Sequence, residues 1–161
     1  MTVKTRAGQP LAVALADPLA VLTVKNVDLA SIGSGSYVGV ATRTAADGAL
    51  DAIEVLVFPE TMRGVGEGFS PWDLEPGSMM TNGTVDGAVK AASATQLTLA
   101  YKGGSKTIHV APNAPVVTFA PADRSDLKPG APVFLGAAKA ADGTLSASRV
   151  VVGKDGVAPP M

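Results

Sequence analysis

The chain has 161 residues, of which 47% are hydrophobic, 4% aromatic and 17% charged. This length suits one ordinary domain or two small ones, and the apolar fraction is large enough to build a core, which excludes wholesale disorder. The formal charge of −1 gives no strong field for nucleic acid or an anionic membrane, and the absence of Cys excludes disulfides, zinc–thiolate sites and thiol nucleophiles within this sequence.

The first residues predict a strand that runs into a turn at Ala7-Gly8. They lack the apolar region of a signal peptide, so we expect no signal peptide within this sequence. No apolar run approaches the roughly 20 residues that span a bilayer as a helix. The sequence therefore predicts no transmembrane segment.

An internal repeat organises the chain. Residues 45–57 recur as residues 140–152, with eight of 13 positions identical and no gap. The match extends backwards, where Asp28 and Gly35 align with Asp123 and Gly130, and residues 2–8 resemble residues 98–104 at an offset of 96. We infer two copies of one small domain.

Each copy has the pattern of short strands, because Val and Thr are frequent and turn residues separate the apolar runs. The predicted strands of the second copy lie near residues 83–90, 96–102, 106–111, 115–119, 132–139 and 144–152. Gly103-Gly104 and Asp142-Gly143 favour hairpin turns. No segment keeps a helical period, so the fold class is all-β. Curling each copy into a small OB-like barrel buries its apolar face best, and a small sandwich is the alternative.

The predicted domains are a first barrel copy over residues 1–58, a linker over 59–81, a second copy over 82–153 and a C-terminal tail over 154–161. The second copy opens with the strand 83–90, for which the first copy has no equivalent. A barrel without one strand exposes unpaired edges, which recruit strands. We therefore expect an open edge of the first copy to pair with a partner protein or with a second copy of the chain.

The linker is rich in Gly, Pro and Met and also holds bulky apolar side chains, which a flexible spacer would lack. We expect it to be ordered, with these side chains either packed on a barrel or forming a binding surface. The candidate binding residues are Met62, Phe69, Trp72, Met79 and Met80. Met thioethers also suit a soft metal such as Cu(I), although the tight spacing typical of such sites is absent.

Catalytic chemistry has little support in the sequence. His109 is the only histidine and is opposite in phase to Ile108 and Val110, which favours a solvent-facing or interdomain face. Residues 33–36 do not match the Gly-x-Ser-x-Gly nucleophile motif. We predict no catalytic residue, no metal site and no cofactor. We also predict no nucleic-acid binding, because no Lys/Arg cluster accompanies the aromatic residues.

The second copy resembles a family of small bacterial β-domains of unknown function. The resemblance rests on residues 126–133, with their Leu-Lys-Pro-Gly turn, and on residues 142–150, with an Asp-Gly hairpin and a Val-rich strand. The first copy departs from this pattern at residues 32–35, which lack the Lys-Pro. Proteins of this family are often exported and carry tandem domains. The resemblance implies a β-barrel fold and export to the periplasm, and it implies no catalytic residues.

The predicted function is that of a non-enzymatic periplasmic or envelope-associated protein that acts by binding or as a structural component. The alternative is a carrier of a small molecule or of a soft metal such as copper, which would use the Met and aromatic residues of the linker.

Overall fold

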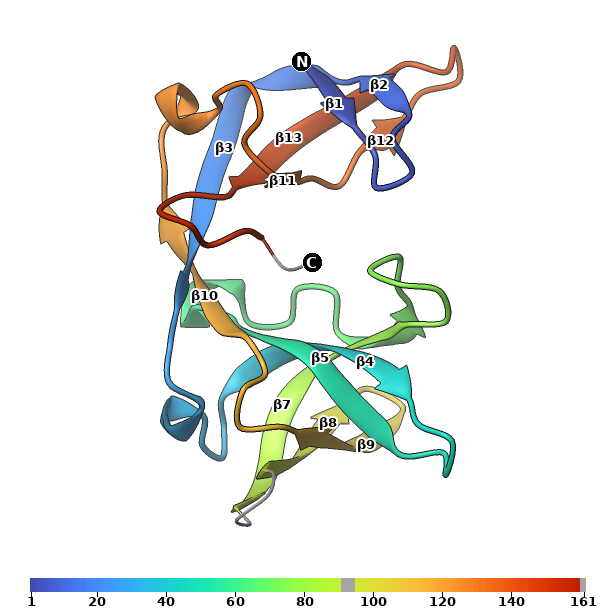
Figure 1. The fold of residues 1–161 in the computed structure, drawn as a ribbon, viewed down its shortest axis with the longest axis vertical. Helices are drawn as coiled ribbons and strands as arrows, with labels where there is room; N and C mark the ends of the chain where they lie inside the picture. Colours follow the sequence, from blue (N-terminus) through green and yellow to red (C-terminus); the bar gives the residue numbers. More distant parts are fainter. Residues whose placement is uncertain (91–94, 160–161) are drawn as a thin grey trace. The chain divides into compact units, whose positions relative to one another are not determined.

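The computed structural model describes residues 1–90 and 95–159, with the side chains of residues 89 and 90 excepted. These residues form two compact units (Figure 1). Unit 1 contains residues 1–24 and 120–159, and unit 2 contains residues 25–119. In the part of the chain so described, no helix has the length and apolar character needed to cross a membrane.

Unit 2 is a closed barrel of five strands (Figure 1). The order around the barrel is β5, β4, β7, β8 and β9, and all neighbours are antiparallel except β9 and β5, which close the barrel in parallel through the pair Asp51 and His109. The strands are β4 (Tyr37–Thr44), β5 (Leu50–Val57), β7 (Met79–Lys90), β8 (Thr95–Tyr101) and β9 (Gly104–Val110). The predicted all-β fold with a small barrel is confirmed here.

Alternating side chains of these strands fill the barrel. Successive residues of a strand point to opposite faces, so every second position turns inward. The buried core consists of Val38, Val40, Val55, Val85, Leu97, Leu99, Ile108 and Val110 from these strands, together with Ile32 and Val116 from outside them. Aliphatic side chains thus supply this core.

The linker is ordered and covers part of the outer surface of this barrel. It contains the 3-10 turn η2 (Glu60–Met62) and the strand β6 (Gly68–Pro71), which pairs with the first residues of β7. The Val65 carbonyl accepts hydrogen bonds from the Tyr37 hydroxyl at 3.1 Å and from Asn82 Nδ2 at 3.3 Å. The sequence reading missed β6 and placed the start of β7 inside the linker.

Unit 1 is built from both ends of the described chain. Its core comprises Val13, Val21, Val24, Ala147, Val150, Val151 and Val152. Its elements are β1 (Thr2–Lys4), β2 (Pro10–Ala12), most of β3 (Ala14–Asn26), the end of β10 (Val116–Pro121), the 3-10 turn η3 (Arg124–Asp126), β11 (Val133–Phe134), β12 (Ala138–Lys139) and β13 (Leu145–Val152). The long strand β3 lies within the first copy, where no strand was predicted over residues 14–26.

Local structure repeats with the sequence. The strand β5 and the strand β13 begin 95 residues apart, as do the turn η1 (Leu29–Ser31) and η3. In the two Asp-Gly turns, Asp47 accepts from the Ala49 N–H at 3.0 Å and Asp142 accepts from the Thr144 N–H at 2.9 Å. Gly48 and Gly143 take positive φ values of 86° and 88°, which glycine tolerates without steric cost.

Strand register repeats as well. Val116 of β10 lies beside Val55 of β5, and Val21 of β3 lies beside Val150 of β13. The two residues on β10 and β3 are 95 positions apart in the sequence, and so are the two residues on β5 and β13. We call two residues related in this way repeat counterparts. The offset is 95, except in β1, where it is 96 because the β1–β2 loop is one residue longer than the β8–β9 loop.

The two units combine halves of the predicted copies. The strands β3 and β10, neighbours in the sheet, each run from one unit into the other, so the segment before each strand and the segment after it belong to different units. Neither unit therefore coincides with residues 1–58 or residues 82–153. Residues 91–94 of the predicted second copy and residues 160–161 of the predicted tail lie outside the described residues.

The described residues of unit 1 do not close into a second barrel, because no strand there takes the place that β7 has in unit 2. The strand missing from unit 1 is the counterpart of the 83–90 strand that the sequence comparison found only once. Two closed barrels were predicted, and one is observed.

The Asp126 carboxylate of unit 1 accepts a hydrogen bond within its own turn and forms an ion pair with the tail. The Asp123 N–H donates to Asp126 Oδ2 at 3.0 Å, and Lys154 Nζ of the tail lies 3.0 Å from Asp126 Oδ1. These contacts, the backbone hydrogen bond first, lower the pKa of the Asp126 carboxyl. Its contribution to folding is present above the ordinary value of about 3.9 and is lost as the pH falls through the lower folded-state pKa.

We expect an NMR titration of Asp126 in the whole chain to give a midpoint below about 3.9. Lys154→Ala should move that midpoint back toward the ordinary pKa, because it removes the ammonium partner. Lys128→Ala should move it less, since Lys128 acts only through its charge at a distance. A midpoint at or above the ordinary pKa would contradict these contacts.

Candidate functional site

The open strand edges of unit 1 form the candidate site. In unit 2, β7 bonds to β4 and to β8, joining the two halves of the barrel. In unit 1 the counterpart of β8 is β1, which pairs with β2, and the counterparts of β4 are β11 and β12, which pair with β13. Among the described residues, these strands have no second neighbour.

The backbone of β1 offers hydrogen-bonding groups at this edge. Met1 exchanges hydrogen bonds with Val13 at 2.8 Å in both directions, and the Thr5 N–H donates to the Gln9 carbonyl. Odd-numbered residues of β1 thus bond to β2, and alternation turns the N–H and C=O groups of Thr2 and Lys4 toward the open edge. Unpaired strand edges of this kind are templates for adding another strand.

The inward face of the β1–β2 hairpin is apolar and incompletely covered. It carries Met1, Val3, Leu11 and Val13, which share one side of the hairpin because they alternate along paired strands. Met1 is 38% exposed and Leu11 is 37% exposed. In unit 2, by contrast, Leu97 and Leu99, the repeat counterparts of Met1 and Val3, are fully buried. Their cover includes Val85 of β7, which lies directly opposite Leu99.

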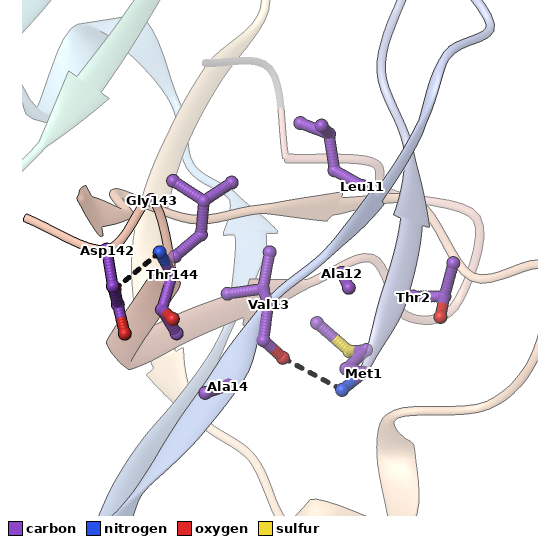
Figure 2. Close-up of a pocket in the computed structure, with 10 residues that line it drawn as sticks. Met1, Thr2, Leu11, Ala12, Val13, Ala14, Asp142, Gly143 and Thr144 are labelled. Atoms are coloured by element: carbon purple, nitrogen blue, oxygen red, sulfur yellow. Dashed lines mark hydrogen bonds between the residues drawn. The ribbon is translucent and has the colours of Figure 1, made fainter. Parts of the chain in front are cut away.

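An open groove of about 630 Å³ runs beside this hairpin. It is lined by Met1 and Thr2, by residues 11–14 and by residues 142–145 of the Asp-Gly turn. Figure 2 shows Met1, Val13 and Thr144 around the groove, with the Met1–Val13 and Asp142–Thr144 hydrogen bonds dashed. The Thr144 N–H lowers the pKa of the Asp142 carboxyl, which favours its charged form at this rim. The groove is therefore mainly apolar with one acidic edge.

The linker residues that the sequence singled out lie elsewhere, in unit 2. Met62 ends η2, Phe69 lies in β6 with Lys106 Nζ 4.5 Å from its ring centre, and Met79 and Met80 begin β7. Met80 is buried and Trp72 is half-buried, and the backbone N–H of Trp72 donates to the Ser78 carbonyl. The packing interpretation accounts for Met80. Binding by these residues stays a prediction.

The soft-metal alternative involves Met62, Met79 and Met80 of the linker, with Met161 and His109 as further possible ligands. Met79 and Met80 are consecutive in a strand, so their side chains point to opposite faces. The described residues contain no group of three or more His, Asp and Glu side chains able to hold a metal ion. The soft-metal alternative gains no support from this arrangement and remains untested.

The histidine lies at the seam where the barrel closes. His109 Nδ1 is 3.7 Å from Asp51 Oδ1, and Nε2 is 2.9 Å from Gln96 Nε2. Both His109 and Asp51 are about half exposed, as the predicted surface position requires. In unit 1 the counterparts of His109 and Asp51 are Ala14 and Ser146, which form the equivalent pair. The two units make the same strand contact with different side chains, which suits a structural role for His109.

The sequence reading missed the apolar residues of the open hairpin. Met1, Val3 and Leu11 carry no motif, and a single copy gives no sign that they lack a cover. The sequence did offer one sign, which was the alignment of this hairpin with residues 97–108. The apolar positions of that segment belong to a complete barrel.

Comparison of the chain with models of known protein families, with curated proteins and with solved structures found no match. The small barrel that the family resemblance implies is present in unit 2, with extra strands around it. Membership of that family remains a prediction that rests on the sequence motifs alone.

Proposed function

We propose that this protein is a non-enzymatic binding protein of the bacterial periplasm or cell envelope, which captures an extended segment of a partner protein at the open edges of unit 1. One observation carries the proposal: unit 1 repeats the strands and register of the barrel in unit 2, but no described residues occupy the place of β7.

Strand addition accounts for the features of these edges. A partner strand would pair with the free groups of Thr2 and Lys4 on one side and with β11 and β12 on the other. It would also cover the exposed faces of Met1 and Leu11, and removing apolar surface from water contributes about 25 cal/mol per Å². On this proposal, capture completes the second OB-like barrel that the repeat predicts.

The near-neutral charge of the chain supports a protein partner over nucleic acid. The location in the periplasm or envelope rests on the resemblance to exported tandem domains. The lack of a nucleophile motif supports a non-enzymatic role.

The test removes one hydrogen-bond donor from the open edge. Lys4→Pro deletes an N–H that faces away from β2, so the hairpin keeps its own hydrogen bonds. Lys4→Ala is the matched control, because it removes the side chain and keeps the donor. We expect immobilised wild-type chain and Lys4→Ala to retain the same protein from an envelope extract, and Lys4→Pro to lose it.

Capture that is equal for all three chains, or absent for all three, would overturn strand addition as the function. Retention of the protein from a cytosolic extract alone would overturn the proposed location.

A further inference from the structure

We infer that unit 1 selects a strand with a small residue, then Gly, then any residue, then an apolar residue, in the pattern small–Gly–x–apolar. The inference rests on the proposed function and adds the chemistry of the partner segment. In unit 2 the equivalent place is filled by β7, and the residues of unit 1 that differ from those around β7 set the pattern.

The apolar position comes from the hairpin. Val85 of β7 lies opposite Leu99 and is fully buried. The repeat counterpart of Leu99 is Val3, which is half-buried and faces the same interior. A strand that follows the path of β7 therefore places its residue at position 85 against Val3, where a charged side chain would be buried without a partner.

The glycine in the pattern is required because the backbones of β7 and β8 approach closely at this position. A Cβ on Gly83 would lie 2.6 Å from the Ala100 carbonyl oxygen, which belongs to the backbone of β8 and cannot swing away. The repeat counterpart of Ala100 is Lys4, whose carbonyl takes the same place at the edge of β1. The residue at position 83 of an added strand therefore has to be Gly.

The small residue comes from a difference between the units. In unit 2, Asn82 Oδ1 occupies space that a Cβ on Gly39 would enter, and the two residues are paired across β4 and β7. In unit 1 the counterpart of Gly39 is Phe134, which holds the same register against β13 as Gly39 holds against β5. From this register we expect the Phe134 side chain to take the space that corresponds to that of Asn82, so that an added strand needs Gly or Ala there.

The occupant is a partner chain and not the β7 of a second copy. In its own barrel, β7 is bonded along both edges to β4, β6 and β8, and Val85 is buried. Releasing it would open that barrel. An extended segment of another protein carries no such cost.

Synthetic peptides that copy residues 79–88 test the pattern, with binding to the whole chain measured by fluorescence anisotropy. We expect the Asn82→Ala peptide to bind, and the unmodified peptide to bind at least about tenfold more weakly. Adding Gly83→Val to the Asn82→Ala peptide should weaken binding by about tenfold or more, because the new side chain meets the backbone of β1. Adding Val85→Asp should weaken binding by a similar factor, because it buries a charge without a partner. The chain variant Lys4→Pro should lose the peptide, and Lys4→Ala should keep it.

A reciprocal variant checks the steric argument. Phe134→Gly recreates the space beside Gly39 and should restore binding of the unmodified peptide. If that variant does not fold, the comparison between the Asn82→Ala and unmodified peptides decides the point by itself.

Equal binding of all the peptides, or binding of none, would overturn the inference. If none binds while Lys4→Pro still abolishes capture from the envelope extract, the proposed function stands and the pattern is wrong. A dimer in sedimentation that Lys4→Pro dissociates, without any peptide, would show that a second copy is the occupant and would also overturn the inference.

Discussion

Gly83→Ala is expected to lower the free energy of unfolding of the barrel in unit 2 by about 2–3 kcal/mol, a cost typical of overpacking a tight site. The added Cβ would meet the Ala100 carbonyl oxygen at 2.6 Å. Because that oxygen belongs to the backbone of β8, the two strands have to separate where β7 joins the two halves of the barrel.

Gly87→Ala is the matched control for this experiment. Gly87 lies in the same strand, pairs with the same neighbour and has no atom within 4 Å of the added Cβ. Urea unfolding followed by the fluorescence of Trp72, the only tryptophan and a residue of unit 2, reports on the barrel directly. Equal midpoints for the two variants would mean that β7 and β8 are not closely packed at Gly83.

Val38→Ala is expected to cost about 2–3 kcal/mol, and the same change at its repeat counterpart, Val133→Ala, about 1 kcal/mol or less. Both valines face the interior in the same register, against Val57 and Val152. Val38 is fully buried beside β7, whereas Val133 is half-buried in unit 1. The difference between these two costs measures the additional burial that a strand in the place of β7 would give Val133.

Native-state hydrogen exchange separates the two effects, because amides of β5 report on unit 2 and amides of β13 report on unit 1. Equal losses of protection would mean that unit 1 is already packed as a complete barrel, which would remove the basis for strand capture. With the Asn82→Ala peptide bound, the cost of Val133→Ala should rise toward that of Val38→Ala.

The elements of the fold that depend on neighbouring residues follow from the sequence. The Asp-Gly turns at residues 47–48 and 142–143 form with matching hydrogen bonds, because an Asp carboxylate and a Gly with positive φ stabilise such a turn wherever it occurs. The strand predicted over residues 144–152 is observed as β13 over Leu145–Val152.

The sequence did not show which side chains are buried and which lack a cover, and only the folded chain does. Glu54 of β5 is only 2% exposed, although nothing next to it in the sequence indicates that this carboxyl side chain is buried. The five linker residues carried the strongest compositional pattern, yet they belong to unit 2 and none of them lines the groove of unit 1. Composition identifies bulky side chains, but it does not identify the side chains that lack a cover.

The sequence by itself determined the two copies, the all-β class, the turns and the single occurrence of the β7 strand, since each of these depends on local propensity or on direct alignment. Only the tertiary structure decided which halves combine. The two copies have the same register, so the hairpin of one copy fits the later strands of either copy. Because β3 and β10 continue as unbroken strands from one unit into the other, each copy is divided between the units. The one β7 strand therefore completes unit 2, and unit 1 keeps its open edges.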